Sequence, residues 1–135
     1  MKHVFVDTNV VIDLLEKRED FFVEAQDLFS LADRQKVKLY ISALTFANTY
    51  YILQKTTGTT NARKILTRFK LLVNVLPIDD KIIELALVSD FADFEDAIQY
   101  YTAIENNLEV IITRNKKDFK NSTLPVLTAR EFLNL

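Results

Sequence analysis

Short apolar runs alternate with longer stretches of helical periodicity along the whole chain, and this alternation restricts the folds open to it. The apolar runs predict strands at residues 4–6, 39–41, 75–76, 110–112 and 125–127. Between them, apolar residues recur every three or four positions, which predicts helices at 10–15, 22–32, 44–53, 62–73, 82–88, 97–108 and 128–134. Such β-α alternation favours a mostly parallel sheet of four to five strands with helices on both faces.

The composition fits a single domain over residues 1–135, because 49% of the chain is apolar and 135 residues can bury a full core. No apolar run approaches the roughly 20 residues that span a bilayer. No signal-peptide pattern follows the first residues, so we expect a cytoplasmic protein without a membrane segment. The net charge of −2 argues against a uniformly basic nucleic-acid-binding surface.

Three residue types are absent or nearly absent, and this limits the catalytic chemistry open to the chain. It has no cysteine, a single histidine (His3) and a single glycine (Gly58). Thiolate sites, histidine-based triads, multi-histidine zinc sites and glycine-rich phosphate loops are therefore excluded. Carboxylates, hydroxyls and amides remain, and these oxygen ligands suit hard cations such as Mg²⁺.

Polar side chains gather where the predicted strands end. In a parallel sheet these carboxyl ends share one edge, where ligands bind. The groups that we expect to converge there are Asp7 and Asn9 after the first strand, Ser42, Thr45 and Asn48 after the second, Thr113, Arg114, Asn115 and Asp118 after the fourth, and Asp93, Glu95 and Asp96 at a helix start.

Each group also has a purely structural interpretation. Asp7 and Asp93 have positions typical of helix N-caps, and Ser42 is a good N-cap as well. Residues 113–115 fit a simple turn after a buried strand, and His3 fits an ordinary strand position. The functional interpretation is favoured because three groups that are distant in sequence fall where the topology brings them together.

Four motifs, in this order, resemble those of the PIN-domain ribonucleases, which include the VapC-type toxins of toxin–antitoxin pairs. They are Val-Phe-Val-Asp7-Thr-Asn9, Ile-Ser42-Ala-Leu-Thr45-Phe-Ala-Asn48, Asp96-Ala-Ile-Gln and Ile-Ile-Thr113-Arg-Asn115-Lys-Lys-Asp118. The resemblance covers essentially the whole chain. It implies a three-layer α/β/α PIN-like fold and an endoribonuclease dependent on Mg²⁺ or Mn²⁺. It also implies an RNA substrate, a small antitoxin partner and a homodimer.

The resemblance carries Asp7 and Asp96 over as metal ligands. Asn48 stands where the family usually has a glutamate, and Asn115 stands where many members have an acid. We therefore expect a third carboxylate from Asp93 or Asp118. The supporting polar side chains would be Asn9, Asn48, Ser42, Thr45, Thr113 and Asn115.

Phosphate binding requires positive charge beside an acidic pocket. Arg114, Lys116, Lys117 and Lys120 flank the fourth motif and are the expected RNA-binding residues. A second basic set, Arg63, Lys64 and Arg68, fits an ordinary solvated helix face.

Three other interpretations compete with a nuclease. An aspartyl-nucleophile phosphatase would need an acid where Asn9 stands, and a receiver domain would need an acidic pair before its aspartate. Both fit poorly. The third is a degenerate PIN domain that binds RNA or an antitoxin peptide without cutting, and Asn48 is the reason to consider it. Metal titration and a cleavage assay, with Asn48→Glu as the diagnostic variant, separate it from an enzyme.

Overall fold

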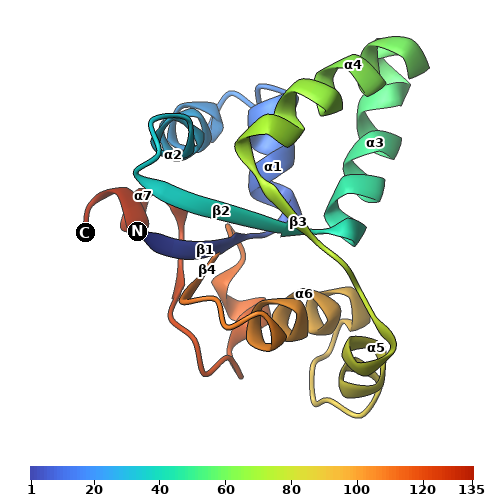
Figure 1. Cartoon of the computed structure of the whole chain (residues 1–135), viewed down its shortest axis with the longest axis vertical. Coiled ribbons are helices and arrows are strands. Elements are labelled where there is room, and N and C mark those ends of the chain that lie inside the picture. Colours follow the sequence, from blue (N-terminus) through green and yellow to red (C-terminus); the bar gives the residue numbers. More distant parts are fainter.

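A computed structural model describes residues 1–135 and contains a five-stranded, entirely parallel sheet (Figure 1). The strand order is β3-β2-β1-β4-β5, so the first strand lies at the centre. The strands are β1 (Lys2–Val6), β2 (Val37–Ser42), β3 (Asn74–Leu76), β4 (Val110–Ile112) and β5 (Val126–Leu127). All five predicted strands are present, and each is parallel to its neighbours as expected.

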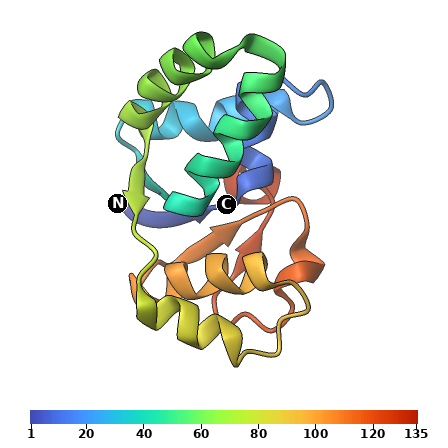
Figure 2. The same ribbon diagram turned by 90° about the vertical axis from the view of Figure 1, so that its right-hand side faces the viewer.

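Helices cover both faces of the sheet, which confirms the three-layer α/β/α arrangement. Figure 2 shows α3 and α4 as a hairpin above the sheet, with α5 and α6 below it. The helices are α1 (Thr8–Leu15), α2 (Phe22–Asp33), α3 (Ala43–Thr57), α4 (Thr59–Phe69), α5 (Asp80–Leu87), α6 (Phe94–Glu105) and α7 (Ala129–Leu133). None of them has both the length and the apolar character required to cross a bilayer.

The alternation of side chains along the strands creates a core on each face. Val4 and Val6 of β1 belong to the larger core, which includes residues from α1 to α4 and from α7. Phe5, between them, points the other way into a smaller core with Tyr100 and Ile111. Because successive strand residues face opposite sides, a strand covered by helices on both faces has to be apolar throughout.

Local signals mark several helix ends, close to the positions that the sequence predicted. The Ser42 side chain accepts a hydrogen bond from the Thr45 backbone N–H, as expected of an N-cap. Gly58 ends α3 with φ +82° and also precedes α4, a conformation that favours glycine. Several boundaries differ from the prediction by two to four residues. The first helix begins at Thr8 rather than residue 10, and α3 continues to Thr57 rather than residue 53. Helix α4 spans 59–69 rather than 62–73, before a 3₁₀ turn at Lys70–Leu72, and α6 spans 94–105 rather than 97–108.

Candidate functional site

The carboxyl edge of the sheet opens into a pocket of about 310 Å³ with mostly polar walls. It lies where β1, β2 and β4 end, and the first turn of α6 closes one side. The structure thus brings together residues separated by more than 100 positions. The pocket is lined by Asp7, Thr8, Asn9, Ile12, Arg18, Leu44, Asn48, Asp93, Glu95, Asp96, Gln99, Asn115 and Asp118.

Asp7 is the most constrained acid of this pocket. Its side chain caps α1, accepting a hydrogen bond at 2.9 Å from the Thr8 backbone N–H. It also accepts hydrogen bonds from Gln99 Nε2 at 3.2 Å and Thr113 Oγ1 at 2.8 Å. Only 7% of the residue is exposed, and none of the chain's ion pairs includes it. Burial raises the pKa of Asp7, although the three hydrogen bonds oppose the shift.

Gln99 connects the polar groups behind Asp7. Its amide nitrogen reaches Thr45 Oγ1 at 2.8 Å and Thr8 Oγ1 at 3.2 Å, while its carbonyl oxygen accepts a hydrogen bond from Ser42. Ser42 and Thr45, both expected near the site, therefore lie beneath the pocket and do not line it. The network holds the end of β2, the start of α1 and helix α6 in one arrangement around Asp7. Gln99 closes the third motif but was not predicted as a site residue, although its place three residues after Asp96 puts both on one helix face.

Asp96 stands among like charges. Burial and the neighbouring carboxylates, Asp7 first and then Asp93, Asp118 and Glu95, raise the pKa of Asp96 to about 7. Asp93 serves as the N-cap of α6, because its Oδ1 accepts a hydrogen bond from the Asp96 backbone N–H at 3.0 Å. The capping interpretation of Asp93 is therefore confirmed, and the residue also lines the pocket.

Asn48 and Glu95 meet across the mouth of the pocket. The amide Nδ2 of Asn48, on α3, donates a hydrogen bond of 3.0 Å to Glu95 Oε1, on α6. Asn48 is half-buried, whereas Glu95 is exposed. The amide in the second motif thus faces the carboxylate that immediately precedes the third motif, a pairing between residues 47 positions apart.

The loop after β4 is held against the start of α1. The Thr113 hydroxyl, which donates to Asp7, also accepts hydrogen bonds from Asn9 Nδ2 at 3.2 Å and from the Asn115 backbone N–H at 3.1 Å. The Arg114 backbone N–H in turn donates to Asn9 Oδ1 at 3.3 Å. Asn9 and Thr113 therefore fix the turn that carries Asn115 and Asp118 to the pocket.

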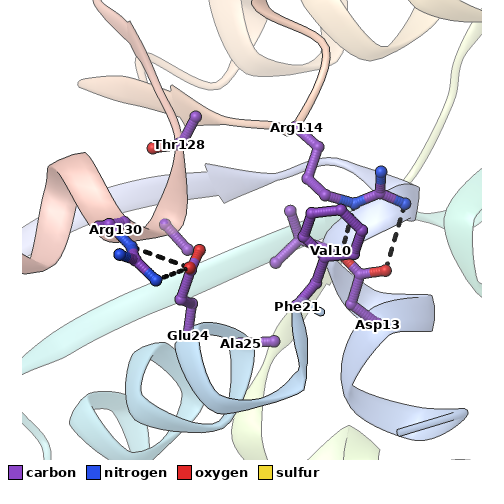
Figure 3. A pocket seen from close by; sticks show the side chains of 9 residues that line it. Val10, Asp13, Phe21, Glu24, Ala25, Arg114, Thr128 and Arg130 are labelled. Carbon is purple, nitrogen blue, oxygen red and sulfur yellow. Dashed lines mark hydrogen bonds and ion pairs between the residues drawn. The ribbon is translucent and has the colours of Figure 1, made fainter. Parts of the chain in front are cut away.

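The Arg114 side chain points away from this pocket into a neighbouring one of about 260 Å³ (Figure 3). Its guanidinium makes two hydrogen bonds to the Asp13 carboxylate, at 2.6 and 3.2 Å, and lies 4.1 Å from the centre of the Phe21 ring. Across the same pocket Arg130 pairs with Glu24 (Figure 3). The structure therefore assigns Arg114 an intramolecular partner that the sequence did not suggest.

The other predicted RNA-binding residues are exposed on the 3₁₀ turn Lys116–Phe119 and just after it. Lys116 forms an ion pair with Glu131 at 3.0 Å. Lys117 and Lys120 have no ion-pair partner within the chain. The basic residue that lines the acidic pocket is Arg18, which the sequence analysis did not single out.

The donor chemistry of the pocket fits a hard divalent cation. Carboxylate and amide oxygens dominate its walls, and Mg²⁺ is commonly held by one or two carboxylates with waters completing its shell. Asp7 and Asp96 would supply those two carboxylates. No set of three or more acidic or histidine side chains stands close enough together, as placed, to hold an ion. Any third carboxylate would come from the exposed acids at the rim.

Comparison with known proteins agrees with the fold and its motifs. Residues 3–117 match the family model described as PIN domain. Ribonuclease VapC1 of Aquifex aeolicus is 31% identical over 137 residues, covering 96% of this chain and 92% of that protein. A toxin–antitoxin complex from Klebsiella pneumoniae contains a chain with 28% identity and a TM-score of 0.69, covering 93% of this chain and 97% of that one. DNA-bound VapBC from Salmonella typhimurium shares the fold, with a TM-score of 0.71 at 18% identity, over 96% and 99% of the two chains.

Proposed function

Because this chain belongs to the PIN-domain family, we propose that it is an endoribonuclease dependent on Mg²⁺ or Mn²⁺ and the toxin of a toxin–antitoxin pair. The observation that carries this proposal is the buried Asp7 carboxylate. It accepts three hydrogen bonds, forms no ion pair with a Lys, Arg or His side chain, and faces a pocket that also contains Asp96. A buried carboxylate without a counter-ion is costly, and sites of this kind are typically functional.

The chain's own residues would orient the reacting groups. Gln99, Thr8 and Thr113 hold both oxygens of Asp7 in place, so that Asp7 and Asp96 present fixed negative charge to a cation. When bound, a divalent cation activates water and stabilises the leaving oxygen of a phosphodiester. Asn9, Asn48 and Asn115 would support the site, and Ser42 and Thr45 would brace Gln99 beneath it.

RNA and an antitoxin are the partners that we propose. Lys117 and Lys120, which have no partner within the chain, are the foremost candidates for phosphate contacts, and Lys116 and Arg114 would contribute if their ion pairs open. The similarity to VapC1 and to toxins in complex with antitoxins supports an antitoxin partner. We also propose a homodimer, which the family resemblance implies, and a cytoplasmic location, which the sequence favours because it shows no signal-peptide pattern.

Asp7→Asn tests the catalytic part of the proposal. We expect this variant to lose Mn²⁺-dependent cleavage of a mixed RNA pool, by roughly 100-fold or more. Asp27→Asn is the matched control, because Asp27 is an exposed residue of α2 outside the pocket and should leave cleavage unchanged. Full activity in Asp7→Asn would refute the assignment.

A second candidate function is RNA or antitoxin binding without cleavage. Asn48 favours it, since an amide at this position leaves the pocket with less negative charge than a glutamate would. Wild-type protein that binds Mn²⁺ but leaves the RNA pool intact would support this alternative. Cleavage that appears only in Asn48→Glu would instead indicate an attenuated enzyme.

A further inference from the structure

We propose that Glu95 is the third carboxylate of the cation site, and that Asn48 is a positioning residue that holds it. This inference rests on the proposed function, because it assumes that the pocket binds a divalent cation. It replaces the expectation that the third carboxylate is Asp93 or Asp118.

The position of Glu95 supports this role. Its side chain projects from the first turn of α6, one residue before Asp96, and lines the same pocket as Asp7. The hydrogen bond from Asn48 Nδ2 occupies only Oε1, and Oε2 accepts none of the chain's hydrogen bonds. Glu95 thus has a fixed oxygen and a free one at the mouth of an acidic pocket.

Structural roles account for Glu95 poorly. It forms no ion pair and is exposed, and the N-cap of α6 is Asp93. A favourable interaction with the helix dipole remains, worth roughly 0.3–1 kcal/mol for an exposed acid in a first turn. The helix-dipole interaction does not explain why Glu95 accepts a hydrogen bond from Asn48 or why its side chain lines the pocket.

The neighbouring acids are less suited to the role. Asp93 has one oxygen committed to capping α6, so coordination through that oxygen would compete with the helix start. Asp118 lies on the exposed 3₁₀ turn, and none of the chain's hydrogen bonds or ion pairs holds its side chain. Asp93 and Glu95 each keep one free oxygen, but the held oxygen of Asp93 caps α6, whereas that of Glu95 is held by the side chain of another pocket residue, Asn48.

Asn48 suits the task of positioning a carboxylate. An amide NH₂ directed at a cation would be repulsive, whereas here it donates to Glu95. The pair therefore places a negative charge at the pocket mouth although α3 carries none at this position. The prediction that follows is specific: moving the carboxylate from residue 95 to residue 48 should preserve metal binding.

Calorimetric titration of Mn²⁺ into the full-length chain tests this prediction with a readout independent of cleavage. We expect Glu95→Gln to weaken binding roughly tenfold, since affinity for hard cations follows the number of ligand charges. The double variant Asn48→Glu/Glu95→Gln, which has the net charge of the wild type, should recover affinity to within about threefold. Glu84→Gln is the matched control, because Glu84 is exposed on α5 and lies outside the pocket.

The possible results separate this inference from the proposed function. If Glu95→Gln binds Mn²⁺ like the wild type while Asp7→Asn does not, the role of Glu95 is refuted and the metal site stands. If Glu95→Gln loses affinity for Mn²⁺ and the double variant does not regain it, the prediction that a carboxylate at residue 48 can replace the one at residue 95 is refuted. If the wild type binds no Mn²⁺, the proposed function and this inference both fail. Thermal unfolding of each variant without metal reports whether the fold is intact.

Discussion

Two aspartates near opposite ends of α1 are both buried, but only one has a counter-ion. Asp13 is 1% exposed and accepts two hydrogen bonds from the Arg114 guanidinium. It also forms an ion pair with Arg18, at 3.8 Å. Asp7 is 7% exposed and has neutral hydrogen-bond donors only. The carboxylate within α1, Asp13, is thus neutralised within the chain, whereas the N-cap carboxylate, Asp7, has no charged partner.

This difference separates a structural charge from a functional one. A buried ion pair is destabilising to break, because the remaining charge keeps its desolvation cost. A buried carboxylate without a cation carries that cost already in the folded protein, and its persistence is explained most simply by a ligand that supplies the cation. Asp13 should therefore matter for the stability of the metal-free protein, and Asp7 for binding.

The largest change in stability should come from Asp13→Asn, which tests whether the Asp13 charge stabilises the fold. The variant leaves the Arg114 guanidinium partly buried without its carboxylate, so we expect the free energy of unfolding to fall by about 3 kcal/mol. Urea denaturation at pH 7 measures the change, with Asp27→Asn as the exposed control. A loss below about 1 kcal/mol would mean that Asp13 is not the structural charge that its burial suggests.

Asp7→Asn should change stability in the opposite direction, by a smaller amount. Removing the unbalanced buried charge should stabilise the metal-free protein by roughly 1–2 kcal/mol, the range typical of substitutions that relieve strain at functional sites. The raised pKa of Asp7 has the same cause, since burial penalises the ionised form. Thermal unfolding in EDTA measures the gain, and repetition with Mn²⁺ should show that the wild type is stabilised by metal and the variant is not. Destabilisation in EDTA would indicate that Asp7 serves the fold.

Much of the fold follows from local patterns in the sequence. The run Val110–Ile112 is a strand because three apolar β-branched residues are buried on both faces of a sheet. Ser42 and Gly58 mark helix ends through side-chain capping and a positive φ, and both effects act within a few residues. That Asp7 and Asp96 line one pocket could also be predicted, because Asp7 follows a parallel strand at the ligand-binding edge and the motif resemblance points to Asp96.

The missed parts of the site depend on contacts between distant residues. Gln99 looks like an ordinary helix residue until the fold places it against Thr45 and Asp7. The pairing of Arg114 with Asp13 joins residues 101 positions apart, and no local pattern tells an arginine that binds phosphate from one that binds a buried acid. Glu95 was recognised as a nearby acid, but its hydrogen bond to Asn48 depends on how α3 and α6 pack.

Asp96→Asn should change the free energy of unfolding least. The dependence of that change on pH tests whether Asp7 shares its unbalanced charge with Asp96. The folded protein holds the pKa of Asp96 at about 7, well above the 3.8 of an unperturbed aspartate. Between pH 3.8 and 7 the folded state keeps a proton on Asp96 that the unfolded state releases. The stability that comes from this proton is therefore complete below pH 3.8 and is lost as pH rises through 7. Asparagine cannot ionise and avoids that loss.

The stability gained by Asp96→Asn should therefore be near zero at pH 4 and reach about 1 kcal/mol at pH 8, after allowance for the partial exposure of Asp96. For a chain of this length that gain corresponds to a rise in Tm of roughly 4 °C. Thermal unfolding in EDTA from pH 4 to 8 gives the profile, and Asp27→Asn should show no such trend. A gain independent of pH would mean that the carboxylates do not repel one another across the pocket, and the unbalanced charge would then belong to Asp7 alone.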